Sequence, residues 1–321
     1  MKKSVAVIYG GYSSEFDISK KSADTIYSNI DTNLFNPFLV EVTRGDWIVE
    51  VEGRDCSINK NNFTYVLNER EIKFDVAFIA IHGTPGEDGK LQAYFDMIGM
   101  PYVNSSVLSS SLSFNKWACN QFLNRFGVNV AKSVLLREND EININEIGND
   151  LSFPCFVKPN DGGSSFGISK VYKEELLGEA ISNAFSEGEE VVIESTLLGR
   201  EVTCGMYGNG NEIVVFPVTE ILTESDFFDT EAKYSSKTSE ITPADISNEL
   251  TVEIQSVSKK IYQLLGLKAI ARVDFIIDVN NVVNVIEVNT IPGMTAESLV
   301  PQQIIAAGLE LKNVLTEILS N

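Results

Sequence analysis

The most specific chemical pattern in the sequence lies near its C-terminus, where polar residues alternate along two predicted strands. Arg272 and Asp274 are two positions apart on the first strand, and Glu287 and Asn289 are two apart on the second. Residues at this spacing point to the same face of a sheet, and residues 278–281 (DVNN) form a plausible hairpin turn between the strands. Hard oxygen ligands with an arginine beside them suit Mg²⁺ that is bound partly through substrate phosphates.

A solvated sheet face would show the same alternation of polar residues. The positions around the polar residues are apolar, however, which predicts that both strands are largely buried. These positions are Ile270, Val273, Phe275, Ile277, Val285, Ile286 and Val288. A buried carboxylate pair without a cation is energetically costly, so the pattern favours the metal site.

Three lysines are candidates for binding phosphate. Lys116 begins a predicted helix, Lys158 ends a strand, and Lys233 lies in the segment EAKY. The chain has 25 Lys and Arg against 45 Asp and Glu, a formal net charge of −20, so an anionic substrate requires a local reversal of charge. The loop at 162–167 (GGSSFG) could close over phosphates, although it matches neither a Walker A loop nor GxGxxG. Taken singly, each lysine reads as a surface residue and the loop as an ordinary hairpin.

Glycines and carboxylates follow two predicted strands of the N-terminal region. The glycine pair at 10–11 precedes Glu15, and His82 with Gly83 precedes Glu87. Both segments would lie at the sheet edge where open α/β proteins bind ligands. Glu15 could hold an ammonium group and a helix N-terminus could attract a carboxylate, which together imply a zwitterionic substrate such as an amino acid. The alternative for His82 is a structural role with both ring nitrogens bonded.

Composition excludes several other classes of protein. The acidic charge repels phosphate backbones, so we expect no nucleic-acid partner. The four cysteines form no CxxC pair and the chain has a single histidine, which argues against a structural zinc site. The N-terminal apolar run of about six residues is shorter than the core of a signal peptide, and no run approaches the length of a membrane span. We therefore expect a cytoplasmic protein without a membrane partner.

The secondary structure predicted around these residues is that of an α/β protein. The apolar run 4–9, its glycine turn and a helix over 18–30 open a βαβ unit, the start of a small open sheet. Further strands are expected at 38–42, 76–81, 156–159, 189–194, 202–207, 269–278 and 282–289. Helices are expected at 91–98, 115–126, 250–265 and, closing the chain, 304–319.

In their order along the chain, these motifs are similar to those of the D-alanine–D-alanine ligase family of ATP-grasp enzymes. The similarity covers essentially the whole length, through VAVIYGGYSSEFDIS, HGTPGEDGKLQ, GMPYVNSS, NKWACNQFL, FPCFVKPNDGGSSFGISKV, VVIESTLLGREVTCG, EAKYSSKT, RVDF and IEVNTIPGMTAESLVP. The resemblance implies a three-domain ATP-grasp fold. Its parts would be an N-terminal open parallel α/β sheet (1–105), a central α+β domain bearing a lid (106–197) and a C-terminal mixed-sheet domain (198–321).

The resemblance also implies a role for each candidate residue. One group would bind ATP: Lys116, Lys158, Ser164, Ser165, Gly167, Glu194, Leu197, Glu201 and Lys233. A second would hold two Mg²⁺ ions, with Mn²⁺ as a substitute: Asp274, Glu287 and Asn289. A third would bind or act on the D-alanines: Glu15, His82, Ser165, Tyr234, Arg272, Gly293 and Ser298.

The activity implied is the ATP-dependent joining of two D-alanines through an acyl phosphate, for peptidoglycan precursors and hence cell wall and cell shape, by a homodimer. D-alanine–D-serine and D-alanine–D-lactate ligases share the fold, and Tyr234 after Lys233 favours D-alanine. A degenerate nucleotide-binding paralog is a third reading, but no metal ligand or phosphate lysine is missing. Departures from the family pattern at Phe16, Asp17 and 296–297 bear on affinity for the second substrate. The general base for the second amine stays unassigned.

Overall fold

The computed structural model describes residues 2–162, 167–223 and 238–321. Among these residues, three larger β-sheets follow one another along the chain, and β5 (Thr64–Leu67) and β6 (Arg70–Lys73) form a separate two-stranded sheet. The predicted site residues Ser164, Ser165, Lys233 and Tyr234 lie outside the described residues.

The first sheet is the open α/β sheet that the sequence predicts. Its strand order is β4-β3-β2-β1-β7, and β1 pairs in parallel with both β2 and β7. Helix α1 packs on β1 and β2, and α2 follows β7. The bounds are β1 (Lys3–Gly10), α1 (Phe16–Asn29), β2 (Phe35–Val42), β3 (Trp47–Val51), β4 (Arg54–Ser57), β7 (Val76–Ile79) and α2 (Lys90–Ile98).

Four short strands in this region were not predicted from the sequence: β3, β4, β5 (Thr64–Leu67) and β6 (Arg70–Lys73). β4 and β6 are rich in charged, exposed residues and show no clear apolar alternation, and β3 and β5 are short. The turn between β5 and β6 consists of Asn68 and Glu69, whose φ angles are 51° and 64°. Two consecutive positive φ values define the tight turn that matches the twist of a hairpin, so turn geometry rather than hydrophobic pattern sets this register.

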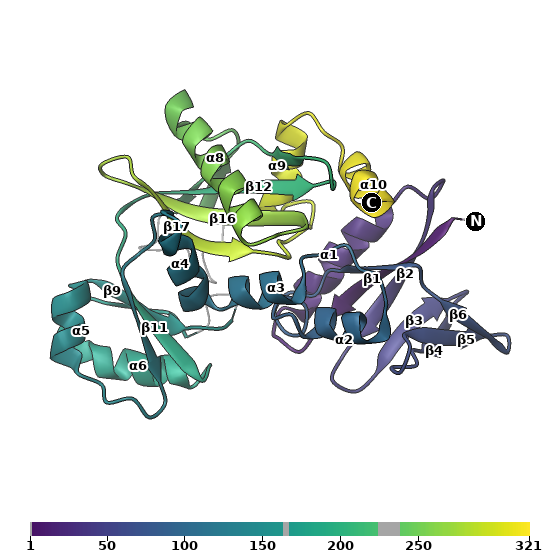
Figure 1. Cartoon of the computed structure of the whole chain (residues 1–321), viewed down its shortest axis with the longest axis horizontal. Coiled ribbons are helices and arrows are strands. Elements are labelled where there is room, and N and C mark those ends of the chain that lie inside the picture. Colours follow the sequence, from purple (N-terminus) through teal and green to yellow (C-terminus); the bar gives the residue numbers. More distant parts are fainter. Residues whose placement is uncertain (1, 163–166, 224–237) are drawn as a thin grey trace.

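The second sheet is antiparallel and bears two helices. Its order is β10-β9-β11-β8, and the two strands that flank the glycine and serine segment, β9 and β10, pair antiparallel. Helices α5 and α6 share a hydrophobic core with these strands and lie with them at one end of the molecule (Figure 1). The bounds are β8 (Ser133–Arg137), α5 (Ile144–Leu151), β9 (Cys155–Pro159), β10 (Ser169–Val171), a short 3-10 helix (Glu174–Leu176), α6 (Leu177–Phe185) and β11 (Glu190–Ser195).

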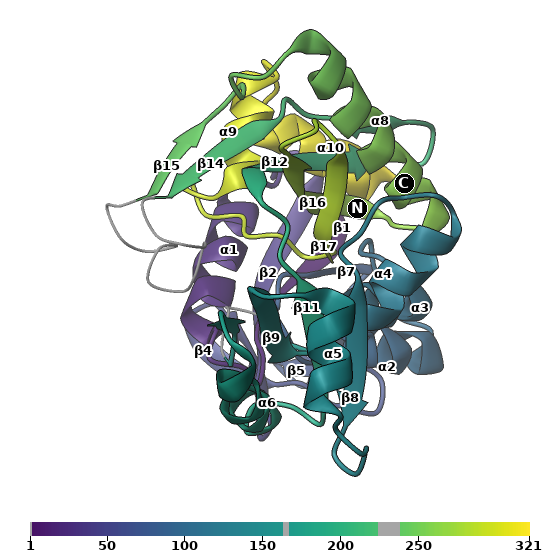
Figure 2. The same ribbon diagram turned by 90° about the vertical axis from the view of Figure 1, so that its left-hand side faces the viewer.

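The third sheet contains the two strands with the alternating polar residues. Its main path is β15-β14-β12-β16-β17, with β13 paired to β12, and β15 lies at its outer edge (Figure 2). The bounds are β12 (Gly199–Gly208), β13 (Ile213–Val215), β14 (Thr219–Thr223), β15 (Thr238–Ile241), α8 (Asn248–Leu264), β16 (Ala269–Asp278) and β17 (Val283–Asn289). The predicted hairpin of β16 and β17 is confirmed.

Two helices connect the first sheet to the rest of the molecule (Figure 1). The serine-rich stretch before the predicted helix is itself helical, α3 (Val107–Phe114), and the Ser106 hydroxyl accepts the N–H of Ser109 at its start. α4 (Lys116–Arg125) begins where the sequence predicts, because the Asn115 side chain accepts the N–H of Ala118.

The predicted closing helix over 304–319 is wrong, because this segment forms two helices. α9 (Leu299–Ala306) ends before Gly308, and α10 (Leu311–Ser320) begins three residues after that glycine. Gly308 has a φ of +73°, the left-handed conformation that ends helices and that glycine adopts without a steric penalty. The apolar period continues across this break, which is why hydrophobicity alone predicts one helix.

The two ends of the chain share one hydrophobic core. α10 packs against α1 (Figure 1), and buried Val5 and Ile26 belong to the same cluster as Ile304 and Leu315. The C-terminal helices therefore cover a face of the N-terminal sheet. Across the described ranges we find no helix with the length and hydrophobicity needed to span a membrane.

Candidate active site

A cavity of about 430 Å³ opens where elements from all three sheets meet. Nine predicted site residues line it: Glu15, His82, Lys116, Lys158, Arg272, Glu287, Asn289, Gly293 and Ser298. The other predicted site residues that the structure describes, which are Gly167, Glu194, Leu197, Glu201 and Asp274, are not among its lining residues. Lys21, Glu240 and Glu297 also line the cavity, and the sequence offered no motif that singled out Lys21 or Glu240 for it.

The β16–β17 hairpin places the predicted metal ligands together. Asp274 lies opposite Glu287, and Arg272 lies opposite Asn289. The register shifts between Asp274 and Phe275, which is the signature of a β-bulge that re-aims side chains. The apolar positions on both strands are buried except Ile276 and Ile286, which are partly exposed, so the polar residues belong to a packed sheet rather than to a solvated one.

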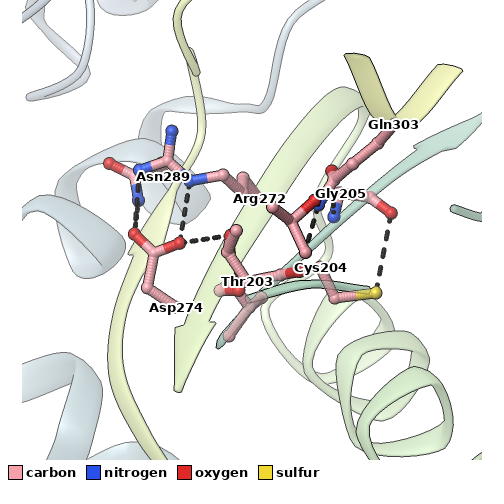
Figure 3. Close-up of polar contacts among 9 residues, drawn as sticks. Thr203, Cys204, Gly205, Arg272, Asp274, Asn289 and Gln303 are labelled. Carbon is pink, nitrogen blue, oxygen red and sulfur yellow. Dashed lines mark hydrogen bonds and ion pairs between the residues drawn. The ribbon is translucent and has the colours of Figure 1, made fainter. Parts of the chain in front are cut away.

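Asp274 is the centre of a hydrogen-bonded network (Figure 3). Arg272 donates to it twice, from Nε to Oδ1 and from Nη2 to Oδ2, both at 2.8 Å. Asn289 Nδ2 donates to Oδ2 at 2.9 Å, and Thr203 Oγ1 donates to Oδ1 at 2.6 Å. Burial by itself lowers the pKa of Arg272, but the carboxylates of Asp274 and Glu287 outweigh burial and raise it. Arg272 is therefore a permanent cation in this cavity.

The side-chain oxygens of Asp274, Glu287 and Asn289 fit a hard divalent cation. Because Asn289 uses its Nδ2 to donate to Asp274, its amide oxygen stays available as a ligand beside Glu287. Two carboxylates and one amide oxygen are the ligand types that Mg²⁺ prefers. Among the described residues no group of three or more His, Cys, Asp and Glu forms a metal cluster, which is consistent with a site that has only two carboxylates.

Two lysines, Lys158 buried and Lys116 partly buried, supply positive charge to the cavity. Lys158 Nζ pairs with a Glu194 carboxylate oxygen at 2.7 Å, and both side chains are about nine-tenths buried (8 % exposed each). Lys116 Nζ donates to the carbonyl oxygen of Gly162 at 2.6 Å. Burial lowers the pKa of Lys116, and the nearby Glu287 carboxylate opposes that shift. Two converging ammonium groups are what an anionic ligand needs in so acidic a protein.

The residues expected around adenine and ribose lie on one continuous segment. Glu194 is near the end of β11, Leu197 is in the loop that follows, and Glu201 is on β12. Glu194 accepts from Lys158 and also from Asn120 Nδ2 at 3.3 Å. This carboxylate therefore links the predicted adenine and phosphate regions.

The N-terminal edge of the cavity depends on close backbone contacts. Gly11 has a φ of +97°, and a Cβ atom there would lie 2.6 Å from Ile81 Cγ2, so the turn before Glu15 requires glycine. Glu87 accepts the backbone N–H of Gly83 at 2.8 Å. Burial raises the pKa of Glu87 to about 8, so this carboxyl group is mostly protonated at neutral pH.

The loop after β17 presents Gly293 and Ser298 to the cavity. Ser298 Oγ accepts the backbone N–H of Thr295 at 3.1 Å and lies 2.8 Å from the Thr295 hydroxyl. A Cβ atom at Gly293 would lie 2.9 Å from Ser298 Oγ, so only glycine fits here without displacing Ser298. The loop backbone is thus held against the start of α9.

A cavity where the three sheets meet, lined by lysines and carboxylates, is the arrangement of an ATP-grasp enzyme. Family models for the N-terminus and the C-terminus of D-Ala–D-Ala ligases match residues 4–105 and 122–320. The chain belongs to the D-alanine–D-alanine ligase family.

Individual relatives are similar over their full lengths. The D-alanine–D-alanine ligases of Azobacteroides pseudotrichonymphae and Bacteroides fragilis are 51% and 46% identical over 322 residues, with at least 99% of each chain covered. Among solved structures, a D-Ala:D-Ser ligase from Enterococcus faecalis superposes with a TM-score of 0.91 at 35% identity, covering 100% of this chain and 99% of that one. A D-alanine–D-alanine ligase from Bacillus anthracis complexed with ATP gives 0.78 at 27%, covering 99% and 96%.

Proposed function

We propose that the protein joins two D-alanine molecules, at the expense of ATP, to form D-alanyl-D-alanine. The observation that carries this proposal is one cavity that combines Glu15, the two lysines and the β16–β17 carboxylates. Relatives at 45–51% identity that carry the name D-alanine–D-alanine ligase support it. The reaction would serve the synthesis of peptidoglycan precursors in the cytoplasm.

In the first step, the carboxylate of the first D-alanine attacks the γ-phosphorus of ATP and ADP leaves. Glu15 would hold the ammonium group of this D-alanine, and Lys116 and Lys158 would neutralise the ATP phosphates. Phosphoryl transfer depends mainly on positioning and charge neutralisation. Asp274, Glu287 and Asn289 would hold two Mg²⁺ ions, which when bound withdraw charge from the phosphate oxygens.

In the second step, the amine of the second D-alanine attacks the carbonyl carbon of the acyl phosphate. The tetrahedral intermediate carries a negative oxygen, which Arg272 and the Gly293 amide would stabilise. Ser298 would bind the carboxylate of the second D-alanine, with His82 near the first. Phosphate then leaves as the carbonyl re-forms. A closed cavity would keep water from hydrolysing the acyl phosphate.

We further propose roles for the remaining predicted site residues and boundaries for the three domains. The residues Ser164, Ser165, Gly167, Glu194, Leu197, Glu201, Lys233 and Tyr234 would complete the ATP site and its lid. The domains would be 1–105, 106–197 and 198–321, with one large sheet in each. We expect a homodimer, which sedimentation velocity would test.

Product mass spectrometry after incubation with ATP, Mg²⁺ and D-alanine tests the proposed function. Parallel samples with L-alanine, D-alanine plus D-serine, and D-alanine plus D-lactate test specificity, with phosphate release followed in each. We expect D-alanyl-D-alanine as the dominant product. A dominant mixed product with D-serine or D-lactate would overturn the proposed second substrate, and no turnover in any sample would overturn the proposed activity.

A further inference from the structure

A chain of hydrogen bonds connects α1 to the loop that follows β17. His82 lies after β7 and is 5 % exposed. Its Nδ1 lies 3.0 Å from the carbonyl oxygen of Ile291, and its Nε2 lies 3.1 Å from the Ser22 hydroxyl. The same hydroxyl oxygen accepts the backbone N–H of Met294 at 3.2 Å. One serine and one histidine thus contact both ends of the segment 291–294.

The Ile291 carbonyl fixes the direction of these bonds. A carbonyl oxygen can only accept, so Nδ1 of His82 carries the proton. Burial disfavours the imidazolium and lowers the pKa of His82, so Nε2 keeps its lone pair. The Ser22 hydroxyl therefore donates to Nε2, and its oxygen lone pairs are left to accept from Met294. The order is Met294 N–H to Ser22, Ser22 O–H to His82, and His82 N–H to Ile291.

Ser22 acts on the cavity only through these partners. It is 1 % exposed and is not among the residues that line the active-site cavity, whereas His82, Ile291 and Gly293 are. Ser22 and His82 border a separate void of about 10 Å³, too small for a substrate. Gly293 lies between the two backbone groups that the relay holds, so its amide direction depends on both bonds.

We propose that Ser22 is a positioning residue for the second step of the reaction. Through His82 and Met294 it fixes the loop 291–294 so that the Gly293 amide points at the oxygen of the tetrahedral intermediate. This inference rests on the proposed function, in which that amide stabilises the intermediate. Loss of the Ser22 hydroxyl should therefore impair dipeptide formation more than it impairs formation of the acyl phosphate.

The kinetic test compares the two steps in the Ser22→Ala variant. Isotope exchange between the bridging and non-bridging oxygens of ATP reports acyl phosphate formation, and dipeptide is measured separately. We expect exchange within about twofold of the parent, dipeptide formation reduced about tenfold and a higher KM for the second D-alanine. Ser28→Ala removes an exposed hydroxyl from the same helix, bonded only to its own backbone at Asp24, and should match the parent. Equal losses in both steps, or no loss, would overturn the proposal.

A second measurement does not depend on activity, and its first readout, the tautomer of His82 in the parent, needs no variant. The chain has a single histidine, so ¹⁵N-histidine in the tag-free protein reports only His82. We expect a protonated Nδ1 and an unprotonated Nε2 at pH 7, and in Ser22→Ala an Nε2 resonance displaced downfield, toward that of a nitrogen without a hydrogen bond. A protonated Nε2 in the parent would overturn the relay. If the parent made no dipeptide but showed the expected tautomer, the proposed function would fail while the relay stood.

Discussion

At the scale of single residues, the cavity is a set of charges that compensate one another. Arg272 is paired with Asp274 and Lys158 with Glu194, and all four side chains are largely buried. Removing one member of such a pair leaves an uncompensated buried charge. The site therefore carries opposite charges at fixed positions before any ligand arrives, which is the preorganisation that phosphoryl transfer requires.

Glu287→Gln should reduce phosphate release with D-alanine by about two orders of magnitude, because it removes one of two carboxylates from the proposed metal site. The fold should be unaffected, as shown by an unchanged far-UV circular dichroism spectrum. Glu253→Gln, an exposed carboxylate on α8, is the matched control and should turn over like the parent. Parental activity in Glu287→Gln would show that the two-strand metal site is wrong.

Glu87 makes stability depend on pH. Its pKa in the folded state is about 8, above its ordinary value of 4.5, so between these values the folded state binds the extra proton. Stability is therefore lost as pH rises from 4.5 to 8. Glutamine does not ionise, so the stability of Glu87→Gln should not fall over this pH range. Its free energy of unfolding should exceed that of the parent by about 2–4 kcal/mol at pH 8 and by less at pH 5. Urea unfolding at each pH measures it. The exposed Glu138→Gln should keep the parental slope, and a pH-independent difference for Glu87→Gln would refute the assignment.

At the scale of elements, the Gln303 side chain joins α9 to the third sheet by three hydrogen bonds (Figure 3). Gln303 Nε2 donates to the carbonyl oxygen of Thr203 and to Thr219 Oγ1, both at 3.0 Å, and its Oε1 accepts the N–H of Gly205 at 2.9 Å. A Cβ atom at Gly205 would lie 2.5 Å from that oxygen, so the strand approaches α9 only because this position is glycine. Since Ser298 directly precedes α9 as its N-cap residue, this contact also positions the substrate loop.

Gln303→Leu should lower the free energy of unfolding by about 2–4 kcal/mol, because it leaves the buried Gly205 N–H and Thr203 carbonyl without this partner. Chemical denaturation measures the change. Ile305→Ala, on the same helix but 72% exposed, should change stability by less than about 0.5 kcal/mol. Similar losses in both variants would mean that α9 contributes through helix content and not through the Gln303 bonds.

At the scale of the whole molecule, the C-terminal end of the chain packs against the N-terminal sheet. The last helix completes the core of the first sheet, and Lys312 pairs with Asp31 at 3.2 Å across the same junction. The second sheet has its own core, formed with α5 and α6. The first and third sheets should therefore unfold as one cooperative unit, and the second sheet is free to open separately.

Hydrogen exchange tests this division. Leu315→Ala should cost about 2–5 kcal/mol and lower amide protection in β1 and β2 as well as in α10, because Leu315 shares their core. Leu136→Ala, in the core of the second sheet, should lower protection within 133–195 and leave β1 unchanged. Loss of protection confined to α10 in Leu315→Ala would contradict the shared core.

Sequence alone determined the features that are local or that recur in a fixed order. Alternation placed Arg272 with Asp274 and Glu287 with Asn289 on single strand faces, since side chains alternate along any strand. Motif order predicted the family, and apolar runs predicted the parallel strands. Apolar periodicity failed at Gly308, where a backbone conformation ends the helix, and in the short strands of 47–73, where turn geometry sets the pairing.

Only the tertiary structure decided which groups meet. Lys158 pairs with Glu194 because β9 and β11 are neighbours, and Ser22 bonds to Met294 across 272 positions because the C-terminal loop lies beside α1. Periodicity reports which face of an element is buried, but it carries no information about which other element covers that face. Those contacts depend on how the three sheets pack, and packing fixes the charges and the hydrogen-bond directions of the cavity.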